Sequence, residues 1–308
     1  MSAGRYAPSP SGDLHVGNLR TALLAWLFAR STGREFLMRM EDLDDRTVAG
    51  ADRRQLADLT AIGIDWDGPV RYQSARRERY DEIVDALTAA GRTFECFCSR
   101  REILDAPRAP HAPEGAYPGT CLRLTATELA ERRASGRPPA IRLRADVDEF
   151  SVIDRFHGDA EGRYTGPVDD FVLRRGDGTP AYNLAVVVDD AESGVHQVVR
   201  GDDLLSSAPR QAHLTTLLGD EPPEYWHVPL VVNADGRRLS KRDGAVTLAD
   251  LAERGISTQQ VVDAMARSLG LADEGESVDA AVLLKRFGFN PELIPSDPWV
   301  FDPDIFCA

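Results

Sequence analysis

The sequence contains few cysteines and no long apolar run. Four cysteines among 308 residues are too few for the disulfide framework of a small secreted protein. The most apolar stretch, residues 21–29, is far shorter than the roughly 20 residues that cross a bilayer. The first residues also lack the apolar segment of a secretion signal. We therefore expect a cytoplasmic protein without a membrane-spanning segment.

Positive charge is also scarce. The chain has 36 lysines and arginines against 50 aspartates and glutamates, a net charge of −14. This balance argues against a protein that coats nucleic acid through bulk charge, although a local basic surface can still dock RNA. The length suggests about two domains with a sizeable core.

Strands and helices alternate in the first part of the chain. An apolar segment at residues 3–8 predicts a strand that ends at two prolines, and residues 36–40 alternate as a second strand does. Apolar residues at helical spacing predict three helices, each followed by a glycine that can end it: Gly33, Gly63 and Gly91. This alternation favours a parallel sheet covered on both faces.

The alternation of strands and helices stops between residues 93 and 180, where Cys, Pro and Gly interrupt short segments. We expect an inserted subdomain there, with isolated strands at 141–143 and 171–173. The alternation then resumes, with strands expected at 184–188, 198–199 and 228–232 and a helix around 210–218. After residue 242, 308 − 242 = 66 residues remain, and their apolar spacing predicts a small helical cap.

The first candidate site is the segment from Ser9 to Asn18, between the first strand and the first helix. Ligands bind at this position in open α/β sheets. The N–H groups that begin the helix suit phosphate, Gly17 allows a nucleotide to approach the backbone, and His15 can donate to a phosphoryl oxygen. A helix-capping loop, in which the histidine and glycine serve local geometry, is the alternative.

The second candidate site is the basic segment at residues 237–244, which contains Lys241. A lysine in a loop that closes on a nucleotide can neutralise pyrophosphate in the transition state. A run of basic residues is, by itself, more typical of a solvated surface loop.

Taken together, the two segments resemble the paired ATP motifs of class I aminoacyl-tRNA synthetases. Four further segments are similar to the glutamyl-tRNA synthetase group: residues 5–12 (RYAPSPSG), 39–44 (RMEDLD), 182–190 (YNLAVVVDD) and 199–207 (VRGDDLLSS). The likeness covers most of residues 5–244. Asn18 is a departure, because the general class motif has histidine there, but an asparagine can still donate a hydrogen bond.

The 66 residues after the second motif cannot hold the large anticodon-binding region of that group. The chain therefore resembles its truncated branch, the glutamyl-Q tRNA(Asp) synthetases. The resemblance implies ATP with Mg²⁺, L-glutamate as substrate, and queuosine in the anticodon of tRNA(Asp) as acceptor. Three alternatives remain: a glutamyl-tRNA synthetase with a separate anticodon module, an adenylate-forming enzyme for another amino acid, and a catalytically silent paralogue that binds RNA or protein. We expect a monomer.

The resemblance also implies a domain organisation of the α/β class. Residues 1–92 and 181–244 would form a Rossmann-like catalytic domain around a parallel sheet. Residues 93–180 would form an inserted connective subdomain with zinc, and residues 245–308 a small C-terminal helical region without an anticodon-binding domain.

Matching positions assign residues to the expected substrates. The implied glutamate pocket consists of Arg5, Ala7, Ser9, Glu41, Tyr182 and Arg200. The implied ATP site consists of His15, Gly17, Asn18, Leu239, Ser240 and Lys241, of which His15, Gly17 and Lys241 are catalytic. The planar guanidinium groups of two arginines and the carboxylate of one acid match the two carboxylates and the ammonium of glutamate. Without the resemblance, Glu41 could be an acid on the approach to the next helix, in a run where Asp44 or Asp45 caps that helix, and Arg200 could be part of a surface ion pair.

A third candidate site holds Cys96, Cys98 and Cys121. Three cysteines in a reducing compartment suggest a tetrahedral structural zinc, and the alternative is reduced cysteines packed as small apolar groups. For the fourth ligand, the resemblance favours Tyr117, whereas His111 is the chemically commoner choice.

Asp189 and Asp190 follow a predicted strand. Carboxylates at such positions often bind magnesium. The resemblance gives them no ligand role, so we expect both to be structural.

Overall fold

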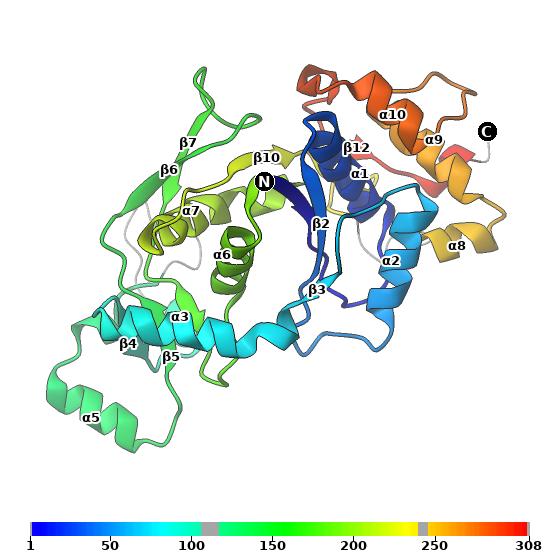
Figure 1. The fold of residues 1–308 in the computed structure, drawn as a ribbon. Coiled ribbons are helices and arrows are strands. Elements are labelled where there is room, and N and C mark those ends of the chain that lie inside the picture. Colours follow the sequence, from blue (N-terminus) through cyan, green and yellow to red (C-terminus); the bar gives the residue numbers. More distant parts are fainter. Residues whose placement is uncertain (1, 106–116, 240–245, 307–308) are drawn as a thin grey trace.

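The computed structural model describes residues 2–105, 117–239 and 246–306 (Figure 1). Its centre is a five-stranded sheet in the order β10-β9-β1-β2-β3. The strands are β1 (Ala3–Tyr6), β2 (Glu35–Met40), β3 (Arg71–Tyr72), β9 (Val195–Gly201) and β10 (Glu224–Val228). All four neighbouring pairs are parallel. The carboxyl ends of the strands therefore lie along one edge, where α/β proteins bind ligands.

Helices cover both faces of this sheet, as the alternating pattern predicted. Helix α1 (Val16–Ser31) packs on one face together with Phe36, Met38 and Trp226. On the other face, α7 (Ala208–Leu217) packs on Ala3 and Val198. Side chains alternate along each strand, so neighbouring residues of β1, β9 and β10 face opposite layers.

The C-terminal helices continue the layer that contains α1. These helices are α8 (Leu248–Glu253), α9 (Thr258–Ser268) and α10 (Ala280–Phe287). Their apolar residues share one core cluster with α1, which explains why α1 is buried along nearly its whole length. Figure 1 shows α9 and α10 beside α1, on the side away from α6.

The chain between β4 and α6 forms two further antiparallel sheets. One joins β4 (Thr93–Cys96), β5 (Ala140–Leu143) and β8 (Val172–Arg174), and the other is the hairpin β6 (Glu149–Ile153) and β7 (Arg163–Pro167). The expectation of isolated strands at 141–143 and 171–173 is wrong, because β5 pairs with both β4 and β8. Such long-range antiparallel pairing leaves no signal in local spacing.

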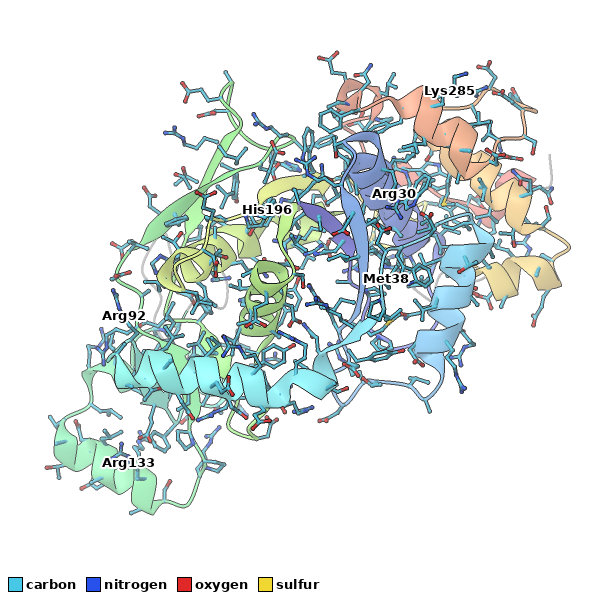
Figure 2. All side chains as sticks on the ribbon, in the orientation of Figure 1. Arg30, Met38, Arg92, Arg133, His196 and Lys285 are labelled. Carbon is cyan, nitrogen blue, oxygen red and sulfur yellow. The ribbon has the colours of Figure 1, made fainter. Side chains whose placement is uncertain are left out.

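The remaining helices lie around these sheets. They are α2 (Ala51–Ala61), α3 (Arg77–Ala89), α4 (Arg100–Asp105) and α5 (Ala126–Ala134), with 3₁₀ turns at Gln73–Arg76, Cys121–Arg123, Asp202–Ser207, Pro291–Leu293 and Pro303–Phe306. Figure 2 shows Met38 on β2 near the centre of the view, with Arg133 and Lys285 on helices at its margins. Among the residues described, no helix has both the length and the apolarity that a membrane span needs.

The predicted strand at 184–188 is wrong. These residues belong to helix α6 (Tyr182–Glu192), and residues 184–190 are all buried. A short continuous apolar run fits a buried helix as well as a buried strand, because neither exposes a polar face. Asp189 and Asp190 therefore lie on a helix and not after a strand.

The strand predicted at 228–232 is two strands, β10 and β11 (Val231–Val232). Pro229 separates them, and proline has no N–H to donate to a sheet. Strand β11 pairs in parallel with β12 (Trp299–Val300), which the sequence did not indicate.

Candidate active site

A cavity of about 550 Å³ opens at the carboxyl edge of the parallel sheet. Its volume is typical of a small-molecule site. Nine of the residues assigned from the sequence line it: Arg5, Ala7, Ser9, His15, Gly17, Asn18, Glu41, Tyr182 and Arg200. They come from β1 and the loop after it, α1, the residue after β2, the start of α6, and β9.

His15 caps the N-terminus of α1 at the wall of this cavity. Its Nδ1 accepts the backbone N–H of Asn18 at 3.2 Å, and the Asn18 Oδ1 accepts the backbone N–H of His15 at 3.3 Å. Because Nδ1 accepts, the neutral ring carries its proton on Nε2, which is then a donor. The capping role considered from the sequence is confirmed, and it is compatible with phosphate binding.

Gly17 lies in the first turn of α1 beside that ring. A Cβ at this position would lie 3.0 Å from two atoms of the His15 ring and 3.1 Å from Cβ of Val231. A side chain would have to displace one of these neighbours, so the absence of a side chain leaves room for the imidazole.

On the β2 side of the cavity, buried charges cancel one another. Arg5 donates to both carboxylate oxygens of Asp190 at 3.3 Å, and Arg39 donates to Asp190 at 2.6 Å and to Glu41 at 3.3 Å. Burial opposes the charge of Asp190, but Arg39 and Arg5 outweigh it and lower the pKa of that carboxyl. Burial raises the pKa of Glu41, which Arg39 and Arg5 partly offset. The expectation that Asp190 is structural is confirmed, since it holds Arg5 in place.

Asp189 is also structural. It is fully buried and accepts hydrogen bonds from Gln73, Arg76 and Tyr80 at 2.7–3.0 Å. These contacts join α6 to α3 and the turn before it.

On the β9 side, Arg200 is just as buried, with 5% of its surface exposed. Its Nε donates to Nε2 of His227 at 2.9 Å, Nη1 to Oε1 of Gln211 at 2.8 Å, and Nη2 to the carbonyl oxygen of Leu204 at 3.3 Å. Among the described residues no carboxylate forms a salt bridge with Arg200. The alternative of a surface ion pair is therefore wrong.

Other assigned residues differ in their placement. Tyr182 begins α6 and is 40% exposed at the cavity. Neither Asp44 nor Asp45 caps α2, whose N-cap is Gly50. Leu239 is 2% exposed and belongs to the core, with its N–H bonded to Val231, and it is not among the lining residues. Ser240 and Lys241 lie outside the described residues.

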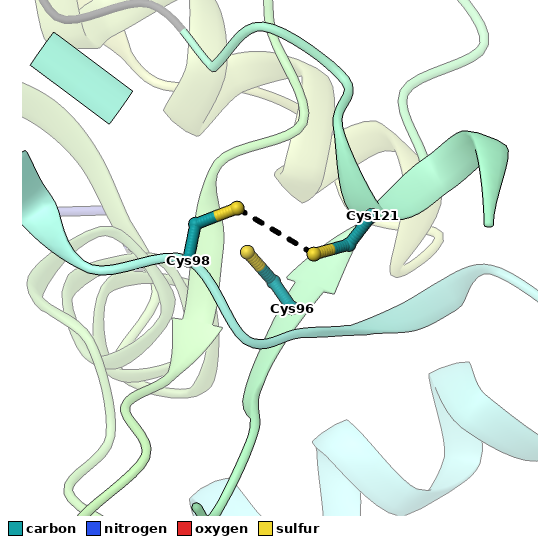
Figure 3. A group of neighbouring side chains, drawn as sticks. All are labelled: Cys96, Cys98 and Cys121. Carbon is teal, nitrogen blue, oxygen red and sulfur yellow. Dashed lines mark hydrogen bonds between the residues drawn. The ribbon is translucent and has the colours of Figure 1, made fainter. Parts of the chain in front are cut away.

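The three cysteines converge in the segment between β4 and β5, and Figure 3 shows their side chains pointing toward one another. Their Sγ atoms all lie within 4.8 Å of each other, and none of the three is in a disulfide. This cluster could hold a metal ion.

Tyr117 adds an oxygen to this cluster. Its hydroxyl lies 3.5 Å from Sγ of Cys96 and 4.0 Å from Sγ of Cys98, and it accepts the backbone N–H of Cys121 at 2.7 Å. The three thiolates are preferred zinc ligands and leave one position of a tetrahedral set open, and the Tyr117 hydroxyl lies beside them. His111 lies outside the described residues.

Two buried residues near the cavity were missed from the sequence. Asp154 and His227 are both fully buried, and they pair behind Arg200. His227 stands in the otherwise apolar segment Tyr225–Val228, and a charged or polar residue on a buried strand is the signal that could have identified it.

Comparisons with known proteins agree with this geometry. The family described as "tRNA synthetases class I (E and Q), catalytic domain" matches residues 3–291. A protein of Nocardia farcinica called glutamyl-Q tRNA(Asp) synthetase is 62% identical, over 97% of this chain and 92% of its own length. Glutamate–tRNA ligase 1 of Halorhodospira halophila is 42% identical over 97% of this chain, but only 65% of its own length is covered.

A solved structure gives the same result. The crystal structure of a glutamate tRNA ligase from Elizabethkingia meningosepticum in complex with its amino acid has a TM-score of 0.81 at 28% identity, covering 98% of this chain and 67% of that one. The resemblance inferred from the motifs is thereby confirmed. The chain belongs to the class I tRNA synthetases of the glutamate and glutamine group, and within it to the glutamyl-Q tRNA(Asp) synthetase family.

Proposed function

We propose that this protein activates L-glutamate with ATP and transfers it to the queuosine base in the anticodon of tRNA(Asp). The observation that carries the proposal is the buried Arg200, which forms no direct salt bridge with a described carboxylate, in the same cavity as Arg5 and Glu41. Relatives that share most of this chain carry the name of this activity.

The charge balance of the cavity supports glutamate as the substrate. Arg5 and Arg39 oppose Asp190 and Glu41, so these four buried charges sum to zero. Arg200 adds one positive charge, and the buried Asp154 carboxylate adds one negative charge on the far side of His227. Zwitterionic glutamate has two carboxylates and one ammonium, so Arg5 and Arg200 can each bind a carboxylate and Glu41 can bind the ammonium.

In the proposed first step, an α-carboxylate oxygen of glutamate attacks the α-phosphorus of ATP. The new P–O bond forms as the bond to pyrophosphate breaks, which gives glutamyl-adenylate. His15 and the N-terminus of α1 bind the phosphates by hydrogen bonding and the helix dipole. Mg²⁺ bound with ATP supplies positive charge to the phosphate oxygens. Ser240 and Lys241 are proposed to bind the leaving pyrophosphate.

In the proposed second step, a hydroxyl of the acceptor nucleoside attacks the activated carbonyl and AMP leaves. No covalent enzyme intermediate is needed, because the protein acts by positioning the reactants and stabilising charge. The acceptor base must enter as part of a single-stranded loop, since stacked and paired bases are not individually accessible.

We further propose that Cys96, Cys98, Cys121 and Tyr117 hold one structural zinc ion in the inserted subdomain of residues 93–180. Residues 1–92 and 181–244 would form the catalytic domain and residues 245–308 its helical cap. Cys121→Ala should reduce zinc content from one ion per chain to near zero and lower the melting temperature. Cys307→Ser is the matched control and should retain full zinc. Full zinc content in Cys121→Ala would contradict the ligand set.

The decisive experiment is aminoacylation with radioactive glutamate of tRNA(Asp) with and without queuosine. Labelling only of the modified tRNA is expected. Charging of tRNA(Glu) instead would favour the parent ligase activity, and pyrophosphate exchange with a different amino acid would overturn the choice of glutamate. RNA binding without any exchange would favour the silent paralogue.

A further inference from the structure

A buried chain of hydrogen bonds extends from Arg200 away from the cavity. Arg200 Nε donates to Nε2 of His227 at 2.9 Å, and Nδ1 of His227 is bonded to Oδ2 of Asp154. Oδ1 of Asp154 accepts the backbone N–H groups of Phe156 at 3.0 Å and His157 at 2.8 Å. His227 and Asp154 are both fully buried, and neither lines the cavity.

We propose that His227 and Asp154 are positioning residues that hold the Arg200 guanidinium in one orientation for a carboxylate of the substrate. This inference rests on the proposed function, because it takes the Arg200 ligand to be glutamate. Neither residue touches the cavity, so both act through Arg200.

The hydrogen-bond chain allows only one protonation state of His227. Arginine nitrogens donate and never accept, so Nε2 of His227 must be unprotonated to bond with Arg200. The ring proton is then on Nδ1, where it is donated to the Asp154 carboxylate. Burial lowers the pKa of His227 to about 4, with Arg200 contributing and Asp154 opposing. The imidazole is therefore neutral at physiological pH.

The surroundings of His227 agree with a neutral ring. The Tyr225 ring stacks on it with centroids 5.6 Å apart and planes inclined by 15°. The His157 ring contacts the backbone carbonyl of His227 at 3.1 Å. The other charged group in direct contact is Arg200, whose positive charge disfavours a second cation beside it.

The hydrogen bonds to Arg200 determine which of its N–H donors are left for a ligand. A guanidinium has five N–H groups. His227, Gln211 and Leu204 take one each from Nε, Nη1 and Nη2. One N–H therefore remains on each terminal nitrogen for a ligand carboxylate. The Tyr225 ring lies on one face of the guanidinium group, with its centroid 5.3 Å from the guanidinium carbon.

Asp154 comes from outside the parallel sheet. It follows β6 of the hairpin β6–β7 and forms an isolated bridge with Tyr225 of β10. The N–H of Arg155 also donates to the Tyr225 carbonyl at 3.1 Å. The segment between β4 and α6 thus supplies the carboxylate that orients a residue of the catalytic sheet.

Asp154→Asn tests the inference with almost no change of shape. Two backbone N–H groups hold Oδ1, so the amide must direct its NH₂ group at Nδ1 of His227. The His227 proton then moves to Nε2, where it opposes the N–H of Arg200 Nε. We expect KM for glutamate to rise roughly 10- to 100-fold, with KM for ATP little changed. Asp159→Asn is the matched control, because Asp159 lies in the same loop and also accepts two backbone N–H groups, but contacts no histidine.

Two substitutions of His227 separate positioning from packing. The Gln oxygen in His227→Gln can replace Nε2 as the acceptor for Arg200, so KM for glutamate should stay near that of the wild type. The Asn amide in His227→Asn can replace only Nδ1, so KM should rise as in Asp154→Asn. A purely structural role would give similar losses in both variants and would overturn the inference.

Nitrogen NMR of the histidine rings provides a readout independent of catalysis. The wild type should show His227 protonated on Nδ1, and Asp154→Asn should show it protonated on Nε2. An unchanged tautomer, or an unchanged KM for glutamate in Asp154→Asn, would overturn the inference while leaving the proposed function intact. If the wild-type protein activates no glutamate, the proposed function fails, and the NMR result alone reports whether Asp154 controls His227.

Discussion

On the β2 side of β1, Arg5 and Arg39 share Asp190, and Arg39 also reaches Glu41, so buried cations and anions are matched. On the β9 side, Arg200 is equally buried, but its partners are an imidazole, an amide and a backbone carbonyl. All these partners are neutral, and they fix the geometry of the guanidinium without cancelling its charge.

The different partners of the arginines on the two sides give them different roles. A paired arginine is a rigid scaffold, and its charge is already satisfied by the protein. An arginine held directly by neutral groups keeps N–H donors for a ligand, and its nearest buried carboxylate, Asp154, lies on the far side of His227. In this cavity, the β2 side supplies order and the acid Glu41, and the β9 side supplies an arginine without a carboxylate in direct contact among the described residues.

The largest expected effect is a loss of stability when the ion pairs on the β2 side are broken. Asp190→Asn leaves Arg5 and Arg39 with one buried anion fewer, and loss of one partner of a buried pair costs about 4 kcal/mol of unfolding free energy. Urea unfolding measures this change. Asp159→Asn, on an exposed loop, is the control. A loss below about 1 kcal/mol would mean that the β2 network is not the scaffold described here.

The next effect is a pH dependence specific to the β9 side. The pKa of folded His227 is lowered to about 4 from its ordinary value of 6.5, so the unfolded chain binds the proton first as pH falls. The stability that His227 contributes is complete above pH 6.5 and is lost between pH 6.5 and 4, about 3 kcal/mol in total.

His227→Gln removes this titration. Urea unfolding at pH 7 and at pH 5 should therefore show a smaller loss of stability in the variant than in the wild type. Equal losses in the two proteins would show that His227 is not buried as a neutral ring.

A substitution at Arg200 itself should affect binding more than folding. Arg200→Lys keeps the charge but loses the planar fork and the donor to His227, so kcat/KM for glutamate should fall about a hundredfold, or about 2.7 kcal/mol. Steady-state kinetics with glutamate and ATP varied separately measure this change. The unfolding free energy should change less than in Asp190→Asn, and the reverse order would contradict the comparison of the two sides.

The parts of the site that lie in contiguous segments could be predicted from the sequence. The strand, turn and helix at residues 3–31 have clear periods, and His15 and Gly17 follow from that segment, whereas Arg5 was assigned by the resemblance. The ends of helices at glycines were predicted for the same reason, because a left-handed residue has a local signature.

The parts that depend on long-range pairing could not be predicted. Asp154 and His227 are 73 positions apart in sequence, and only the docking of β6 against β10 brings them together. Helix α6 was misread because residues 184–188 are buried on all sides, which removes the period that separates helix from strand. The role of Asp190 in holding Arg5 depends on that helix and was missed with it.

The smallest expected effect comes from the phosphate-binding part of the cavity. A substitution there tests whether the difference between Arg5 and Arg200 is independent of ATP binding. Gly17→Ala places a Cβ 3.0 Å from the His15 ring, and the ring must shift to relieve the contact. We expect KM for ATP to rise about fivefold, or about 1 kcal/mol, while KM for glutamate is unchanged, because Arg200 lies on β9, where His227, Gln211 and Leu204 hold it. Ala22→Gly, deeper in α1, is the control for a change in helix stability alone. A rise in KM for glutamate equal to that for ATP would show that the N-terminus of α1 and the β9 side respond as one unit.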